Sequence, residues 1–76
     1  MFDPSDGDLL IKGAHHTGFT VHDAVTDARL AEGLSYAEAL AFVRGRGRTS
    51  VWQINVDDRG RPIGQPRFLA LDAVES

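Results

Sequence analysis

Apolar and polar residues alternate in two short stretches near the start of the chain. The run DLLIKGA is rich in branched apolar residues. The run GFTVHDA places Phe19 and Val21 on one side and the polar Thr20 on the other. Because a period of two is typical of a β-strand, we predict two strands that are joined by the loop AHHT.

The clearest helix signal begins at Ser35. Glu38 follows it three residues later, which is the spacing of a capping box. Apolar residues then recur at helical spacing, namely Tyr36, Ala39, Leu40 and Val43, with Phe42 at the margin. We therefore predict a helix over residues 36–44, which Gly45 closes in the left-handed conformation.

The run SVWQINV predicts another strand, because Trp52 and Ile54 alternate with polar residues. We expect this apolar side to face the helix, with Trp52 packed against Leu40 and Val43.

The last part of the chain predicts a turn and an edge strand. The run DDRGRP contains a flexible glycine and two aspartates that can accept bonds from the turn backbone. We place the edge strand at residues 68–71, because Pro62 and Pro66 keep the preceding stretch out of a sheet interior.

These elements predict one α+β domain that spans residues 1–76. Its two layers would be an antiparallel sheet of three to five strands and one helix packed on one face, in the order β-β-(β)-α-β-(β). Residues 1–7 are polar and turn-rich, so we expect them to be flexible or to lie along the surface. Residues 21–32 fit either helical spacing or a continuing hairpin.

Length and composition limit the kind of protein. A chain of 76 residues buries only about 60 % of its unfolded surface, so we expect one small core and no deep enclosed active site in a monomer. Cysteine is absent, so neither disulfides nor thiolate metal sites can stabilise the fold. No apolar run approaches the roughly 18 residues of a membrane span, and the N-terminus lacks a secretory pattern. We expect a cytoplasmic protein without membrane contact.

The net charge of −3 argues against a generic nucleic-acid-binding protein. Six of the eight basic residues nevertheless lie in residues 39–76, and three of them form the run RGRGR. Arginine side chains are suited to phosphate oxygens, but an arginine and a glycine are also ordinary residues at a helix exit. We favour the interpretation of RGRGR as the exit from the helix. If the arginines do bind a protein or a nucleic acid, the candidate residues are Arg44, Arg46, Arg48, Arg59 and Arg61.

No set of residues predicts catalysis or cofactor binding. The three histidines, His15, His16 and His22, are not accompanied by a cluster of metal ligands at suitable spacing. An enzyme that used them would need a pocket in which His15 or His16 faces His22. Asp57 and Asp58 are interpreted as turn residues. We therefore predict no catalytic residue, no metal, no cofactor and no enzyme activity.

The segment from Gly18 to Leu40, GFTVHDAVTDARLAEGLSYAEAL, resembles the central signature of HicB-type antitoxins. That signature has a glycine and an aromatic residue at the start of a second strand, a third strand that ends in a glycine, and a serine or threonine cap before an E-A-L helix. The matching residues are Gly18, Phe19, Val21, Gly33, Ser35, Glu38, Ala39 and Leu40. The resemblance implies a small, partial ribonuclease-H-like sheet with one helix, which occupies a toxin by protein contact. It also favours a strand at about residues 29–32.

Together these observations predict a non-enzymatic interaction module. We expect it to bind a protein partner, a toxin or another effector, through its sheet edge or its acidic N-terminal half. The first alternative is a nucleic-acid-binding protein that uses the loop of Arg44, Arg46 and Arg48. The second alternative is a small protein without catalytic activity, and a homo-oligomer remains open in every case.

Overall fold

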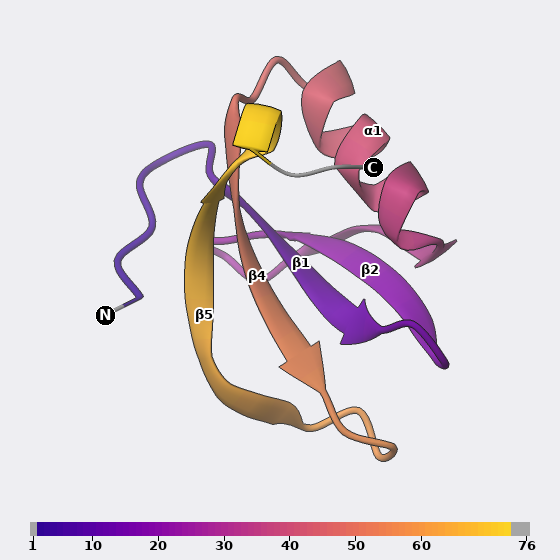
Figure 1. Cartoon of the computed structure of the whole chain (residues 1–76). Helices are drawn as coiled ribbons and strands as arrows, with labels where there is room; N and C mark the ends of the chain where they lie inside the picture. The colour runs from indigo at the N-terminus through magenta and orange to yellow at the C-terminus, as the bar shows by residue number, and fades with distance from the viewer. Residues whose placement is uncertain (1, 74–76) are drawn as a thin grey trace.

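The computed structural model describes residues 2–73, which form an α+β domain with one α-helix and five strands (Figure 1). The prediction of this class is confirmed. The elements in chain order are β1 (Leu9–Ala14), β2 (Gly18–Asp23), β3 (Arg29–Leu34), α1 (Tyr36–Gly45), β4 (Ser50–Val56), β5 (Pro62–Ala70) and a short 3-10 helix, η1 (Leu71–Ala73). At ten residues, α1 falls short of a bilayer crossing, and no helix within residues 2–73 is long and apolar enough for one.

The sheet is mixed, with the strand order β3-β2-β1-β4-β5. Neighbouring strands are antiparallel except β1 and β4, which run parallel with Leu10 opposite Trp52. The prediction of an antiparallel sheet is therefore wrong at its centre. The reason is that α1 carries the chain from the β3 edge across the sheet, and a helical crossover allows the next strand to pair in parallel.

The start of α1 agrees with the sequence prediction. The Ser35 hydroxyl oxygen accepts a bond from the Glu38 N–H at 3.1 Å. The Glu38 carboxylate accepts one from the Ser35 N–H at 2.9 Å, which completes the capping box. This hydrogen bond to Ser35 also lowers the pKa of Glu38.

The end of α1 differs from the prediction. Gly45 is the last residue of the helix, and Gly47 instead takes the left-handed conformation, with φ at +79°. The N–H of Gly47 donates to the Arg44 carbonyl at 2.9 Å, and the N–H of Arg48 donates to the Val43 carbonyl at 3.4 Å. Both bonds satisfy carbonyls that the last helical turn leaves free. The run RGRGR contains two suitable glycines, and the helix uses the second.

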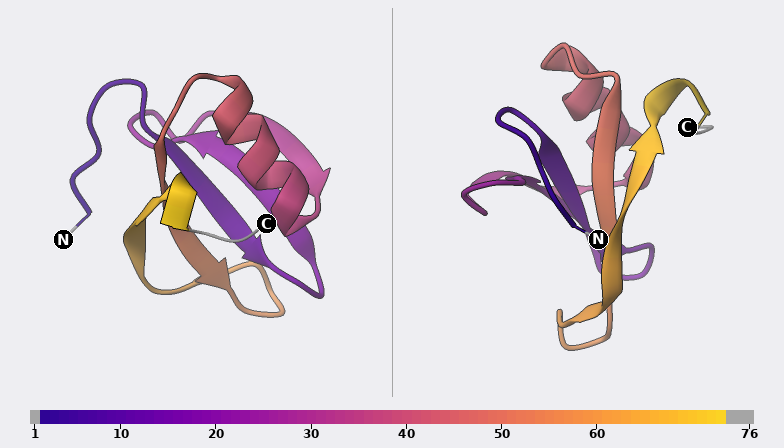
Figure 2. Two further views of the ribbon diagram at one scale, coloured as in Figure 1. Left: turned by 45° about the horizontal axis from the view of Figure 1, so that its top comes forward. Right: turned by 90° about the vertical axis from the view of Figure 1, so that its left-hand side faces the viewer.

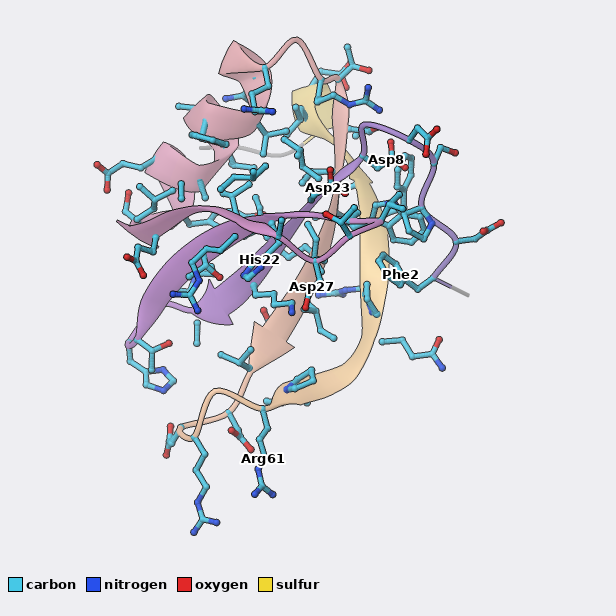
Figure 3. The ribbon with its side chains drawn as sticks, turned by 180° about the vertical axis from the view of Figure 1, so that it is seen from behind. Phe2, Asp8, His22, Asp23, Asp27 and Arg61 are labelled. Carbon is cyan, nitrogen blue, oxygen red and sulfur yellow. The ribbon has the colours of Figure 1, made fainter. Side chains whose placement is uncertain are left out.

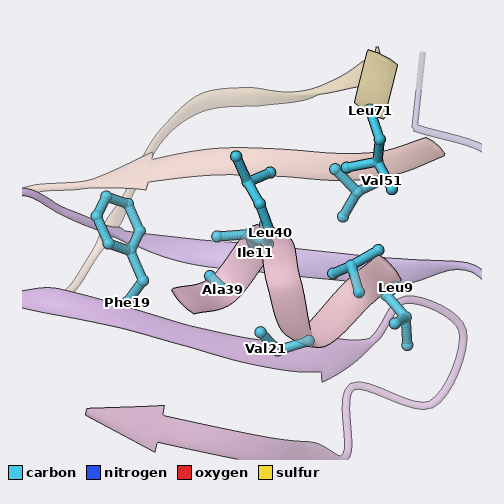
Figure 4. Packing of buried hydrophobic residues seen from close by; sticks show 9 residues of the cluster. Leu9, Ile11, Phe19, Val21, Ala39, Leu40, Val51 and Leu71 are labelled. Atoms are coloured by element: carbon cyan, nitrogen blue, oxygen red, sulfur yellow. The ribbon is translucent and has the colours of Figure 1, made fainter. Parts of the chain in front are cut away.

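The main core lies between α1 and the sheet (Figure 4). Its buried members are Leu9, Ile11, Phe19, Val21, Ala39, Leu40, Val43, Val51 and Leu71. The strand β4 contributes Val51 to this core, and its tryptophan lies elsewhere.

Trp52 is buried on the opposite face of the sheet, at 9 % exposure, in a second cluster with Leu10, Ala24 and Ile54. Two views show α1 over one face only (Figure 2). The expected contact of Trp52 with Leu40 and Val43 is therefore wrong, although Trp52 and Ile54 do share a face. Alternation identifies residues on the same face, but it does not identify the face that the helix covers.

Both edge strands are present, as predicted, but each is longer than predicted. The structure has β3 at Arg29–Leu34 and β5 at Pro62–Ala70, where the sequence predicted strands at about 29–32 and at 68–71. The strand β3 confirms the strand interpretation of residues 29–32. The strand β5 covers nine residues, and it includes Pro62 and Pro66. Both prolines are tolerated because β5 has a neighbour on one side only. The register of β5 with β4 shifts between Gln53 and Asn55, so β5 bends there.

Candidate functional site

Two arginines of the helix exit contact other parts of the chain. The Arg44 guanidinium donates to the carbonyl oxygen of Leu71 at 3.1 Å, which joins α1 to η1. The guanidinium carbon of Arg46 lies 5.7 Å from the centre of the Phe42 ring, within the range of a cation–π contact. Arg44 therefore has a structural role, and Arg46 packs on its own helix.

The third exit arginine, Arg48, forms an ion pair with Asp8 at 2.6 Å. The same carboxylate accepts bonds from the Trp52 indole N–H at 3.1 Å and from the Ser5 N–H at 2.9 Å. The Ser5 bond, followed by Trp52 and the charge of Arg48, lowers the pKa of Asp8, and burial opposes this shift. Asp8 thus connects the N-terminal segment, β4 and the helix exit.

Arg59 and Arg61 lie in the turn between β4 and β5, at the other end of β4 from the helix exit. A seven-residue strand separates the two groups by roughly 20 Å. Figure 3 shows Arg61 far from Asp8, the partner of Arg48. The structure therefore does not gather the five candidate arginines on one surface. The Asp57 carboxylate accepts bonds from the N–H groups of Arg59 and Arg61, each at 2.9 Å, so Asp57 is a turn residue.

The histidines are divided between the two faces. His15 and His16 line a hollow on the helix side. His22 is buried on the other face, where a ring nitrogen lies 2.8 Å from the Thr20 hydroxyl. The arrangement that an enzyme would need, with His15 or His16 facing His22, is not formed. Within residues 2–73, no three His, Cys, Asp or Glu side chains group closely enough to hold a metal ion.

The hollow has a volume of about 520 Å³. Residues from separate segments line it, including His15, Phe19, Tyr36, Gln53, Asn55 and Ile63. The Tyr36 hydroxyl donates to the side-chain oxygen of Gln53 at 2.6 Å, and burial raises the pKa of Tyr36. Sequence analysis missed this site because it requires the strand order, which the sequence pattern does not contain.

The most exposed apolar side chains of the sheet lie on β5. Phe68 is 55 % exposed and Ile63 is 57 % exposed. The Phe68 ring centre lies 4.8 Å from that of Trp52, which in turn lies 4.9 Å from that of Phe2. An aromatic cluster of Phe2, Trp52 and Phe68 therefore lies on the helix-free face and includes one residue of the edge strand β5. Sequence analysis could not find this cluster, because Trp52 and Phe68 are recognised as neighbours only once the register of β4 with β5 is known.

Comparison with protein-family models, with curated proteins and with solved structures found no match for this chain. The resemblance to HicB-type antitoxins therefore rests on the matching residues within 18–40.

Proposed function

We propose that the protein is a non-enzymatic interaction module that binds a protein partner through the edge strand β5, as a minimal antitoxin or inhibitor would. The observation that carries the proposal is an edge strand with a half-exposed aromatic residue, Phe68, whose ring contacts that of a buried tryptophan at a tilted angle. A cytoplasmic location is part of the proposal, supported by a composition without cysteine.

The outer side of β5 can accept another strand. Edge strands carry unpaired N–H and C=O groups, and an extended segment of a partner can bind to them. Pro62 and Pro66 lack a backbone N–H, so residues 67–70 are the longest stretch of β5 without a proline, and alternate N–H groups of this stretch point away from β4. We therefore expect the partner segment to pair with this short stretch.

Phe68 lies inside the same stretch. Aromatic residues next to a well-packed pocket contribute disproportionately to protein interfaces. Because Trp52 supports the Phe68 ring from the neighbouring strand, Phe68 is held in place before a partner arrives. We expect an apolar side chain of the partner to pack on Phe68 while its backbone pairs with β5.

The acidic N-terminal half is less suited to this role. Asp8 is paired with Arg48, and Asp27 is paired with Lys12 at 2.9 Å. The Asp23 carboxylate accepts bonds from the backbone of its own turn. Since these carboxylates already have partners in the chain, the sheet edge is the stronger candidate surface.

Nucleic-acid binding through the candidate arginines remains a weaker proposal. The net charge is −3, and Arg48 is already neutralised by Asp8.

The residues that match HicB-type antitoxins have structural roles: Gly18 and Gly33 have positive φ, and Ser35 caps α1. Because these roles are structural, the matching residues do not themselves identify a partner.

The test compares Phe68→Ser with Val25→Ser. Val25 is 50 % exposed in the turn before β3, so it controls for the loss of an exposed apolar side chain. We expect the wild type and Val25→Ser to retain the same partner in affinity capture and Phe68→Ser to lose it. Hydrogen exchange should slow at residues 67–70 in the complex. Equal retention by all three proteins, or unchanged exchange on β5, would reject the proposal.

A further inference from the structure

The hollow on the helix side exists because α1 covers only part of the sheet. The helix begins at Tyr36, and the β4–β5 hairpin extends past this point (Figure 1). Beyond Gln53, no element within residues 2–73 therefore covers the helix side of β4, and Asn55 is exposed. The volume of about 520 Å³ is within the range of small-molecule sites.

One wall of the hollow is aromatic. The ring centre of Phe19 lies 5.5 Å from that of His15 and 5.2 Å from that of Tyr36, and the His15 and Tyr36 rings are 6.0 Å apart. Ile63 of β5 also lines the hollow. The Tyr36 ring is fixed by its hydroxyl bond to Gln53. Phe19 is only 3 % exposed, so His15 and Tyr36 are the rings that can offer a stacking surface to a flat ligand.

The floor carries two amide side chains, Gln53 and Asn55, which are two residues apart on β4. The Gln53 oxygen is engaged by Tyr36, which leaves its amide N–H groups as donors. The Asn55 side chain makes no hydrogen bond within the described part of the chain. A free amide offers one donor and one acceptor side by side, and adenine presents the complementary pair at N6 and N7.

The turn at the rim has no net charge, because Asp57 and Asp58 accompany Arg59 and Arg61, and neither arginine lines the hollow itself. His16 lies 2.8 Å from Asp58, which ties the loop before β2 to the turn that contains Arg59 and Arg61. Neither arginine forms an ion pair within residues 2–73, and both are exposed. Guanidinium groups are suited to phosphate oxygens, so a phosphate attached to a ligand in the hollow would find partners on this turn.

We infer that the hollow binds a nucleobase with a preference for adenine, and that Arg59 and Arg61 interact with the attached phosphate. A free nucleotide and an unpaired base of a single-stranded nucleic acid present this same chemistry. The site is separate from the β5 edge at Phe68, so it does not depend on the proposed protein partner.

The test is an NMR titration of the labelled full chain with AMP, GMP, UMP and ribose 5-phosphate at low salt. We expect AMP to shift the Asn55 and Gln53 side-chain amide signals and the signals of Tyr36, with weaker effects from GMP and UMP. Ribose 5-phosphate should move only the signals of the turn at residues 57–61. An oligonucleotide of adenines that binds much more tightly than AMP would identify single-stranded nucleic acid as the source, and equal affinity would identify a free nucleotide.

The matched variants are Asn55→Ala and Gln65→Ala. Gln65 is an exposed amide on β5 that does not line the hollow. Asn55→Ala should weaken AMP binding about tenfold, and Gln65→Ala should leave it unchanged. The inference is overturned if no nucleotide shifts the Asn55 signal, if ribose 5-phosphate shifts it equally, or if Asn55→Ala binds AMP as the wild type does. Shifts of Asn55 that only a protein partner produces would also overturn it.

Discussion

At the scale of single residues, Asp8 joins three segments of the chain through its carboxylate. Its carboxylate holds Arg48 from the helix exit and Trp52 from β4, both about forty positions away in the sequence. Hydrogen bonds of this kind to a buried carboxylate stabilise its ionised form. The contacts of Trp52 and Arg48 on the helix-free side of the sheet therefore depend on the ionised state of the Asp8 carboxyl group.

We expect Asp8→Asn to destabilise the protein by about 1–3 kcal/mol at pH 7, because Arg48 loses its ionic partner. The pKa of Asp8 is lowered in the folded state, so its contribution is present above the unfolded pKa of about 3.9 and is lost as pH falls through the folded pKa. The difference between wild type and variant should therefore shrink as the pH falls below about 4. Urea unfolding followed by Trp52 fluorescence measures both.

The matched control for this change is Asp6→Asn, which alters an exposed carboxyl in the same segment. It should leave the free energy of unfolding nearly unchanged. A difference between wild type and Asp8→Asn that stays constant from pH 7 to pH 3 would contradict the assigned role of the Asp8 charge.

At the scale of elements, the exit from α1 depends on two glycines in different conformations. Gly45 is helical, whereas Gly47 has φ at +79°. A Cβ at either position would meet no neighbouring atom within 4 Å. Any difference between their alanine variants therefore reports backbone conformation alone.

Gly47→Ala should destabilise the protein by about 1–2 kcal/mol, because an alanine is strained in the left-handed region. Gly45→Ala should be neutral or stabilising by up to about 1 kcal/mol, because alanine is the better helix residue. Thermal or urea unfolding of the two variants checks the opposite signs. If Gly45→Ala proved the more destabilising, Gly45 would be the residue that ends the helix.

The sequence predicted those elements that depend on neighbouring residues, and it missed what depends on pairing. The capping box at Ser35 was recognisable because both partners lie within one turn. The face of the sheet on which Trp52 lies could not be recognised, since the alternation in β4 is the same whichever face the helix covers. The hollow was missed for the same reason: Tyr36 and Gln53 meet only because β4 inserts beside β1. The aromatic cluster of Phe2, Trp52 and Phe68 was missed as well, because its recognition requires the register that places Trp52 opposite Phe68.

At the scale of the whole molecule, the sheet buries apolar residues on both faces with unequal cover. The helix covers one face, where nine buried residues form the main core. On the other face, within the described residues, the cluster around Trp52 is packed against the partly buried Phe2 of the N-terminal segment. The segment thus acts as a thin second cover for the sheet. The expectation that residues 1–7 are flexible or lie along the surface stays a prediction, and Met1 lies outside the described residues.

Phe2→Ala tests whether this cover protects the helix-free face. The Phe2 ring meets Trp52 edge-on, with centres 4.9 Å apart, so its removal should bring water to the indole and cost about 1–2 kcal/mol of stability. We expect Trp52 emission to move to longer wavelength and acrylamide quenching to rise, while slow hydrogen exchange in α1 is retained because the main core is on the other side. Val25→Ala, which trims an exposed side chain that is not part of the Trp52 cluster, should change neither optical signal. An unchanged Trp52 spectrum in Phe2→Ala would mean that Leu10, Ala24 and Ile54 bury the indole without help from the N-terminal segment.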